Sequence, residues 1–151
     1  MNSLIIYKST EHKNTEKIAL GINGILKGKL VKAEEVNTDQ FNMYDLIGFG
    51  SGIFYGKFHK SILNLVEHFE KVENKKAFVF STSGQGKENY NDSLKSILES
   101  KGFDVIGSFA CKGFDTFGPF KIFGGIAKGR PNENDMKAAE DFAVKLLKKN
   151  S

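Results

Sequence analysis

The sequence predicts a single α/β domain built on a doubly wound parallel sheet of five strands, with helices on both faces. Two observations favour this fold class. Short apolar runs alternate with helix-length amphipathic segments along the chain, which is typical of strands joined by crossover helices. The apolar runs are also continuous, as expected for parallel strands that are buried on both faces. A length of 151 residues fits one domain, so we expect residues 1–151 to fold as one unit.

Five segments have the composition of strands. The first, third and fourth are uninterrupted apolar runs at residues 4–7, 46–50 and 77–80. The segment Lys29–Val36 is less apolar, which predicts a strand at an edge of the sheet. We expect Phe103–Cys111 to be the fifth strand.

Four segments have the periodicity of helices. Thr15–Leu26 places its apolar residues on one side, and residues 58–72 carry apolar side chains at alternating steps of four and three. A helix around residues 94–98 is expected to end at Gly102, because glycine readily adopts the left-handed backbone that follows a helix. The last helix is expected to begin after Asn132, an N-cap residue followed by acids, and to continue through residue 147.

Composition and charge narrow the classes of function. The net charge is +4, but the lysines are interspersed with acids and cluster only in the C-terminal helix, where they complement its dipole. This pattern favours a solvated surface over a nucleic-acid site. No apolar stretch is long enough to cross a bilayer, and Cys111, the single cysteine, excludes an intramolecular disulfide. We therefore expect a cytoplasmic protein with no nucleic-acid binding and no membrane insertion.

The first of three loops that follow strands is rich in hydrogen-bond donors. Ligands of a doubly wound sheet bind beyond the carboxyl ends of its strands. Residues 8–15 join the first strand to a helix and contain Ser9, Thr10, Asn14 and Thr15. Such donors, with the free backbone N–H groups of a helix N-terminus, suit a phosphate, although the same residue types also cap helices. The loop has no glycine, which disfavours a dinucleotide fingerprint or a P-loop.

The other two loops are rich in glycine. Residues 50–57 combine glycines with the adjacent aromatics Phe54 and Tyr55, which suits a flat ring system or, alternatively, a turn with one core aromatic. Residues 81–86 offer backbone N–H and C=O groups to the edge of a heterocycle, although such glycine pairs also occur in plain turns. No nucleophile–base set and no metal-ligand spacing is visible, so we predict neither catalytic nor metal-binding residues.

Together these segments resemble the flavodoxin family. The matching stretches are Ile5–Thr10 with Asn14 and Thr15, then Asp45–Gly52, then Phe78–Gly84, and the resemblance extends over nearly the whole chain. It implies a flavodoxin-like sheet of order 2-1-3-4-5 and one non-covalently bound flavin mononucleotide (FMN). For the phosphate it implies contacts from Ser9, Thr10, Asn14 and Thr15, with His12 in the same loop. For the flavin ring it implies contacts from Ser51, Gly52, Ile53, Phe54, Tyr55 and Gly56, and from Thr82, Ser83, Gly84, Gln85 and Gly86.

The resemblance also implies a role. It is that of an electron carrier between a reductase and an acceptor protein, and the alternative is an FMN-dependent oxidoreductase such as a quinone reductase or a protoporphyrinogen-oxidase-like enzyme. Two departures from the family matter. The chain has no tryptophan, so Tyr55 or Phe54 must stack on the flavin, and it is basic where most flavodoxins are acidic. We therefore expect redox partners with acidic or neutral docking surfaces.

A phenylalanine repeat follows the fifth strand. Phe114, Phe117, Phe120 and Phe123 recur at every third residue in a glycine-rich stretch. One interpretation is packing of a long loop on the fifth strand. The other is a flap beside the flavin or an apolar docking patch, which would make Asp115 a candidate for tuning the flavin or delivering a proton.

Overall fold

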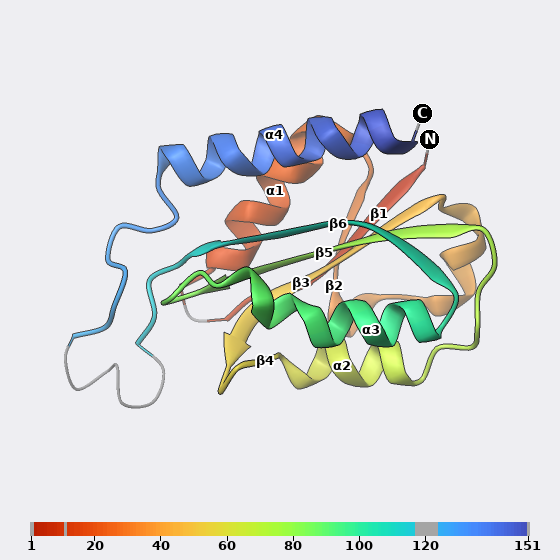
Figure 1. Ribbon diagram of the computed structural model, residues 1–151, viewed down its shortest axis with the longest axis horizontal. Helices are drawn as coiled ribbons and strands as arrows, with labels where there is room; N and C mark the ends of the chain where they lie inside the picture. Colours follow the sequence, from red (N-terminus) through yellow and green to blue (C-terminus); the bar gives the residue numbers. More distant parts are fainter. Residues whose placement is uncertain (1, 11, 117–123, 151) are drawn as a thin grey trace.

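The computed structural model describes residues 2–10, 12–116 and 124–150, and it shows a central sheet between two layers of helices (Figure 1). The strands are β1 (Ser3–Lys8), β2 (Lys29–Lys32), β3 (Leu46–Phe54), β4 (Lys57–Phe58), β5 (Lys75–Ser83) and β6 (Phe103–Lys112). The α-helices are α1 (Asn14–Leu26), α2 (Lys60–Glu67), α3 (Asp92–Ser100) and α4 (Glu133–Asn150). Short 3₁₀ turns are η1 (Ala33–Glu35), η2 (Thr38–Met43) and η3 (Glu88–Asn91).

Five of the strands form a parallel sheet in the order β2-β1-β3-β5-β6. The two-residue β4 lies off this path and pairs antiparallel with the end of β3. When β4 is set aside, the observed order is the predicted 2-1-3-4-5. The predicted fold class is therefore confirmed, and the carboxyl ends of the main strands lie at one end of the molecule (Figure 1).

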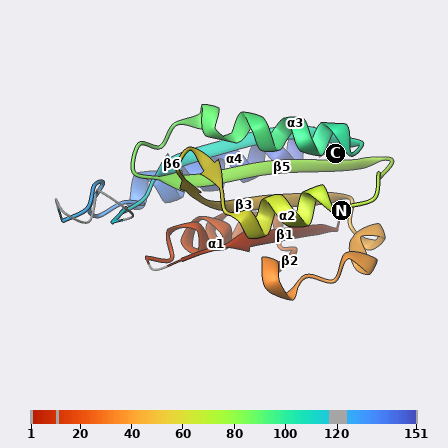
Figure 2. The same cartoon turned by 90° about the horizontal axis from the view of Figure 1, so that it is seen from below.

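Helices cover both faces of the sheet. Helices α1 and α4 lie on one face and α2 and α3 on the other, which Figure 2 shows from below. Neighbouring residues of β1 point to opposite layers: Ile5 packs with Ile18 of α1, and Ile6 packs with Ile62 of α2. All of these side chains are fully buried. This two-sided burial is the reason why the strand sequences are continuous apolar runs.

Glycines of β3 make room for aromatic rings of β5. Gly48 pairs with Phe78 and Gly50 pairs with Phe80 across the parallel ladder. A Cβ atom at Gly48 would lie 2.2 Å from Cζ of Phe78, and one at Gly50 would lie 2.1 Å from Cζ of Phe80. Both rings are fully buried and cannot move aside. The two strands therefore fit each other at these two positions.

Two predicted elements are shorter than their apolar patterns. The helix expected over residues 58–72 spans only Lys60–Glu67, because Phe58 belongs to β4 and the chain leaves the helix at His68. Phe69 lies beyond the helix but stays buried in the same core cluster, so a continuous apolar stripe did not require a continuous helix. The strand expected over residues 29–36 ends at Lys32, and the next residues form η1.

The two predicted helix termini are confirmed. Gly102 follows α3 with φ of 99°, and a Cβ atom there would lie 2.1 Å from the carbonyl oxygen of Val72. Asn132 caps α4: its side-chain oxygen accepts from the N–H of Asp135 at 3.0 Å. The Asp135 carboxylate accepts in return from the N–H of Asn132 at 2.8 Å.

Within the described ranges, the structure contains no helix with the length and apolar character that a membrane crossing requires.

Candidate cofactor site

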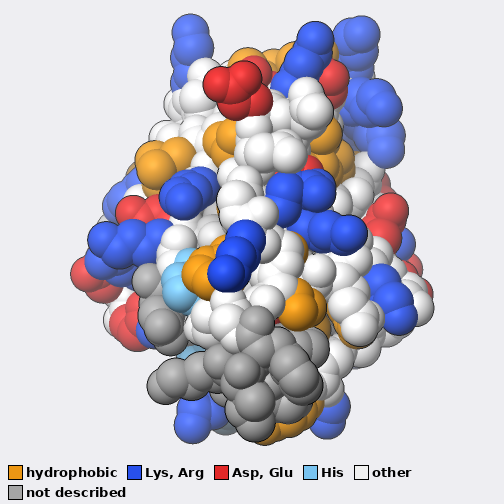
Figure 3. All heavy atoms as spheres, turned by 90° about the vertical axis from the view of Figure 1, so that its left-hand side faces the viewer, with side chains coloured by type: hydrophobic (Ala, Val, Ile, Leu, Met, Phe, Trp, Pro, Cys, Tyr) orange, Lys and Arg blue, Asp and Glu red, His pale blue; other side chains and the backbone are white. Residues whose placement is uncertain are grey.

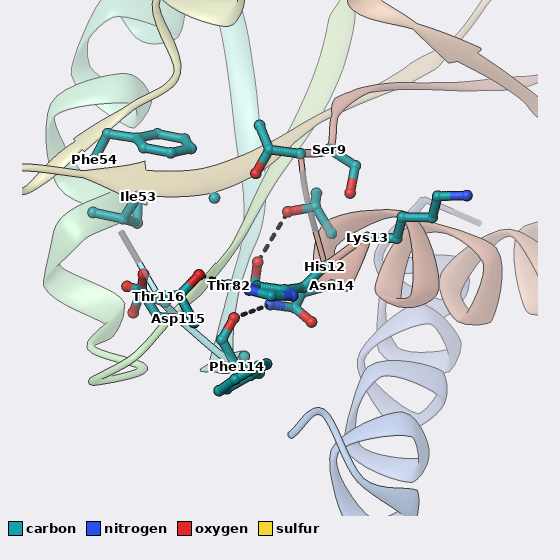
Figure 4. Close-up of a pocket in the computed structure, with 15 residues that line it drawn as sticks. Ser9, His12, Lys13, Asn14, Ile53, Phe54, Thr82, Phe114, Asp115 and Thr116 are labelled. Carbon is teal, nitrogen blue, oxygen red and sulfur yellow. Dashed lines mark hydrogen bonds between the residues drawn. The ribbon is translucent and has the colours of Figure 1, made fainter. Parts of the chain in front are cut away.

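Four segments enclose a cavity of about 290 Å³ at the carboxyl ends of the strands (Figure 4). The lining residues are Ser9, Thr10, His12, Lys13, Asn14 and Thr15 after β1, Gly52, Ile53 and Phe54 at the end of β3, Thr82 and Ser83 at the end of β5, and Gly113, Phe114, Asp115 and Thr116 after β6. The cavity therefore lies where a doubly wound sheet places its ligand.

The loop between β1 and α1 presents a helix N-terminus to this cavity. Lys13 precedes the helix in a left-handed conformation, with φ of 55°. The hydroxyl oxygen of Ser9 accepts from the N–H of Glu16 at 3.2 Å. The N–H groups of Asn14 and Thr15 donate to no acceptor in the part of the chain that the structure describes. Two N–H groups with no acceptor among the described residues, at the positive end of a 13-residue helix, form a setting for an anion.

The hydroxyl and amide side chains of this loop reach across to other segments. The hydroxyl oxygens of Thr15 and Thr82 lie 2.9 Å apart, and both side chains are buried. The side-chain amide of Asn14 donates to the carbonyl oxygen of Phe114 at 2.8 Å. Nε2 of His12 lies 2.9 Å from the hydroxyl oxygen of Thr116. These bonds fix the loop after β1 against the end of β5 and against the segment after β6.

The segment after β6 folds back over the site. Asp115 and Ile126 exchange two backbone hydrogen bonds, at 2.9 and 2.8 Å, in an isolated antiparallel bridge. The ring of Phe114 lies 4.4 Å from that of His12, centroid to centroid. A Cβ atom at Gly84 would lie 2.1 Å from Cδ1 of Ile126, so this segment also covers the loop after β5. Phe114 therefore lies beside the cavity, whereas Phe117, Phe120 and Phe123 lie outside the described residues.

The opposite wall is the end of β3. Ile53 and the half-buried ring of Phe54 line the cavity. Phe54 meets the ring of His59 edge to face, with 5.4 Å between the centroids. Tyr55 and Gly56 form the turn to β4 with φ of 51° and 79°, and Tyr55 is 82% exposed outside the cavity. Phe54 is thus the aromatic residue of this loop that faces the cavity (Figure 4).

Two groups near the site have pKa values moved by burial. Burial and the nearby Lys8 ammonium lower the pKa of His59, whose Nδ1 accepts from the N–H of Ser61 at 3.0 Å. His59 is therefore neutral near pH 7, with its Nδ1 free of a proton. Burial raises the pKa of the Cys111 thiol to about 12, so this thiol is not ionised at neutral pH. Among the described residues, no cluster of three His, Cys, Asp or Glu side chains has the arrangement of a metal site.

The structure brings most of the predicted site residues together. Ser9, Thr10, His12, Asn14, Thr15, Gly52, Ile53, Phe54, Thr82 and Ser83 all line the cavity. Ser51 is buried behind it and accepts from the N–H of His59 at 3.0 Å. Tyr55, Gly56, Gly84, Gln85 and Gly86 do not line it.

Five lining residues were not among the predicted cofactor contacts: Lys13, Gly113, Phe114, Asp115 and Thr116, of which the flap interpretation had named Phe114 and Asp115 as candidates beside the flavin. The last four follow the fifth strand, whose carboxyl end must lie at the same edge of the sheet as the others. That position in the chain is the signal that could have placed them at the site. Lys13 was not chosen because a lysine gives no sign in the sequence of a left-handed backbone.

Known proteins show similarity over the whole chain. A family model described as "Flavodoxin domain" matches residues 4–113. An uncharacterised protein of Methanocaldococcus jannaschii is 49% identical over 150 residues, which cover 98% of this chain and 99% of that protein. The structure is similar to that of flavodoxin 2 from Bacillus cereus, with a TM-score of 0.74 and 20% identity over 99% of each chain. It is also similar to a Fusobacterium nucleatum flavodoxin mutant bound to flavin mononucleotide, with a TM-score of 0.70 and 17% identity over 99% of this chain and 97% of that one.

Proposed function

We propose, from the premise that this chain belongs to the flavodoxin family, that it binds FMN non-covalently and carries electrons between partner proteins. When bound, FMN supplies reversible uptake and release of electrons, a chemistry that the side chains of the cavity do not have. The residues of the chain bind the cofactor, orient it and limit the access of water.

The observation that carries this proposal is the helix N-terminus inside the cavity. The N–H groups of Asn14 and Thr15 point to no acceptor among the described residues, and the hydroxyl groups of Ser9 and Thr10 lie in the same wall. A phosphate supplies acceptors for several such donors at once and is attracted by the helix dipole. The donor set therefore fits the phosphate of FMN.

The rest of the cavity fits a flat apolar group. Ile53 and Phe54 form one wall, and Ser83, Asp115 and Thr116 belong to the facing segments. An aromatic wall stacks on a ring, and neighbouring polar groups can bond to the heteroatoms at its edge. The Thr15–Thr82 hydrogen bond joins the phosphate end to this ring end and holds their relative positions.

The size of the cavity favours a carrier over an enzyme. At about 290 Å³ it lies just below the range of about 300–1,000 Å³ that pockets for single small molecules occupy. A quinone reductase or a protoporphyrinogen-oxidase-like enzyme needs space for a substrate in addition to FMN. Asp115 and Thr116 line the same cavity, so a substrate on that side would have to share this wall with the flavin.

Spectroscopy and calorimetry test this function. We expect the purified chain to show the absorbance of oxidised flavin, or to acquire it when FMN is added. If the two N–H groups hold the phosphate, FMN binds about a hundredfold more tightly than riboflavin, since each charge-assisted bond contributes about 1.5 kcal/mol or more. A colourless chain that takes up no FMN contradicts the proposal. Turnover of quinones with NADPH as the sole electron donor would instead favour the enzyme.

A further inference from the structure

Exposed lysines from different loops surround the cavity. Figure 3 faces the end of the molecule at which the parallel strands finish, and it shows Lys and Arg side chains spread across this end, with Asp and Glu mainly towards its margins. Besides Lys13 of the loop after β1, four exposed lysines stand in the loops and strand ends around the cavity, and the turn after β3 adds a tyrosine that is 82% exposed. We call this set the basic rim; its members are Tyr55, Lys57, Lys87, Lys112 and Lys128.

Backbone geometry ties the rim to the cavity. Lys57 pairs with Phe54 across the β3–β4 hairpin, and side chains of directly paired residues lie on the same face. Lys112 precedes the lining residue Gly113, and its Cγ would lie 2.9 Å from a Cβ atom at Gly86. Lys87 follows Gly86 directly. Lys57 and Lys112 thus lie beside lining residues of the cavity, and Lys87 belongs to the loop that packs against Lys112.

The acids of this end leave the rim positive. Glu34 is paired with Lys8, and the Asp135 carboxylate accepts from the Arg130 guanidinium at 2.7 Å, which lowers the pKa of Asp135. Among the described residues of the loops that carry the rim, the remaining acids are Glu88 and the half-buried Asp115. Elsewhere the charges are mixed, as where Lys71 follows Glu70 in the loop after α2.

Tyr55 has a strained backbone conformation and an exposed side chain. It occupies the first central position of a two-residue turn, with φ of 51°, where glycine, asparagine or aspartate is preferred. A left-handed conformation costs a bulky residue about 1–2 kcal/mol, and its exposed ring returns little burial energy. Strain of this kind clusters at functional positions, and exposed tyrosines are frequent anchors of protein interfaces.

We propose that the basic rim is the docking surface for a redox partner with an acidic surface, and that Tyr55 is its apolar anchor. This inference rests on the proposed function, because the rim surrounds the cavity assigned to FMN. Complementary charges raise the association rate and make it depend on salt. We commit to a protein partner because the rim lysines Lys57 and Lys112 lie beside residues that line a candidate cofactor site.

Electron transfer to two small proteins of opposite charge tests the surface. The flavin-loaded chain is reduced chemically and mixed in a stopped-flow instrument with an acidic rubredoxin or with basic cytochrome c, each of which accepts one electron at ferric iron. At low ionic strength we expect rubredoxin to react faster, and its rate to fall about tenfold towards high salt. The triple variant K57E/K87E/K112E should reverse this salt dependence. The matched control Lys71→Glu should retain it, and Tyr55→Ala should slow the reaction at all salt concentrations.

Three outcomes would overturn the inference. The first is a faster reaction with cytochrome c than with rubredoxin at low salt. The others are a rate whose salt dependence is unchanged in the triple variant, or is lost equally in the Lys71→Glu control. The inference would also be overturned if the chain bound a single-stranded oligonucleotide as tightly as it binds rubredoxin, and if the triple variant lost affinity for both to the same extent. Failure of the proposed function appears separately, as a chain without flavin absorbance. In that case an NMR titration of the flavin-free chain with zinc-substituted rubredoxin tests the docking surface independently of flavin binding. We expect chemical-shift changes at residues of the rim, and we expect them to be absent in the triple variant.

Discussion

Substitution of Lys13 separates the backbone conformation at the start of α1 from the charge beside the cavity. Lys13 has φ of 55° and ψ of 28°. A non-glycine residue pays about 1–2 kcal/mol for this left-handed conformation, whereas glycine avoids that cost but loses about 0.5–1 kcal/mol more in backbone entropy on folding. We therefore expect Lys13→Gly to stabilise the flavin-free chain by about 0.5–1 kcal/mol. Lys13→Ala keeps the strain, so its stability should stay within about 0.5 kcal/mol of the wild type.

Binding of FMN should respond differently, because both substitutions remove the same charge. The ammonium of Lys13 is exposed and points away from Phe54 and Thr116 in Figure 4, so it acts on a bound phosphate over a distance. A unit charge at about 10 Å contributes roughly 0.4–1.7 kcal/mol, and solvent screening favours the lower half of this range. A loss of about 0.5–1 kcal/mol corresponds to a two- to fivefold increase in the Kd for FMN in either variant.

Urea denaturation of the flavin-free chains and calorimetric titration with FMN measure the two effects. The Lys13→Gly and Lys13→Ala variants should bind FMN with the same affinity and should differ in the free energy of unfolding of the flavin-free chain. The reasoning is refuted if the two variants are equally stable, which would mean that the backbone of Lys13 is unstrained. It is refuted equally if either variant binds FMN as tightly as the wild type.

Three further expectations concern residues that do not line the cavity. Because Cys111 is buried with a pKa raised to about 12, a thiol reagent should label it only in denaturant, as mass spectrometry would show; rapid labelling of the native chain at pH 8 contradicts this. The pKa of Asp135 is lowered by Arg130, so this ion pair contributes above the unfolded pKa and is lost as pH falls through the folded value. Asp135→Asn should therefore cost about 1–2 kcal/mol at pH 7 and less at pH 3, by urea denaturation at both pH values. Gly48→Ala should cost about 1–3 kcal/mol, because its Cβ atom would lie 2.2 Å from a buried ring, whereas Gly24→Ala, with open space around it in a helix, should be neutral or stabilising in the same thermal melts.

The sequence was sufficient to predict the sheet and the region of the site. Continuous apolar runs specify strands buried on both faces, and their alternation with helices leaves few topologies open. The loop from Ser9 to Thr15 was recognisable because its donors stand directly before an apolar helix. The order of the strands was predicted through the family resemblance, and the structure has that order.

Contacts between distant segments were not predictable in the same way. The bond from Asn14 to the carbonyl oxygen of Phe114 joins residues 100 positions apart, and no periodicity encodes it. Tyr55 was expected to stack on the flavin because it is aromatic; in the structure it stands in a turn with positive φ and is exposed, which no sequence pattern indicates. The apolar pattern that predicted a helix as far as Val72 includes residues that pack against the core but lie beyond the end of α2. Tertiary packing decided each of these features.

The fit between β3 and β5 also fixes how the two strands align. Each ring occupies the space above the glycine directly across the ladder, Phe78 at Gly48 and Phe80 at Gly50. A slip by one residue would place Phe78 across from Ile47 or Phe49 in place of a glycine, and it would turn the side chains of the strand to the opposite face of the sheet. The residue types at the two positions of each pair can therefore change only together. A redesign of this sheet has to treat each glycine and its facing ring as one unit.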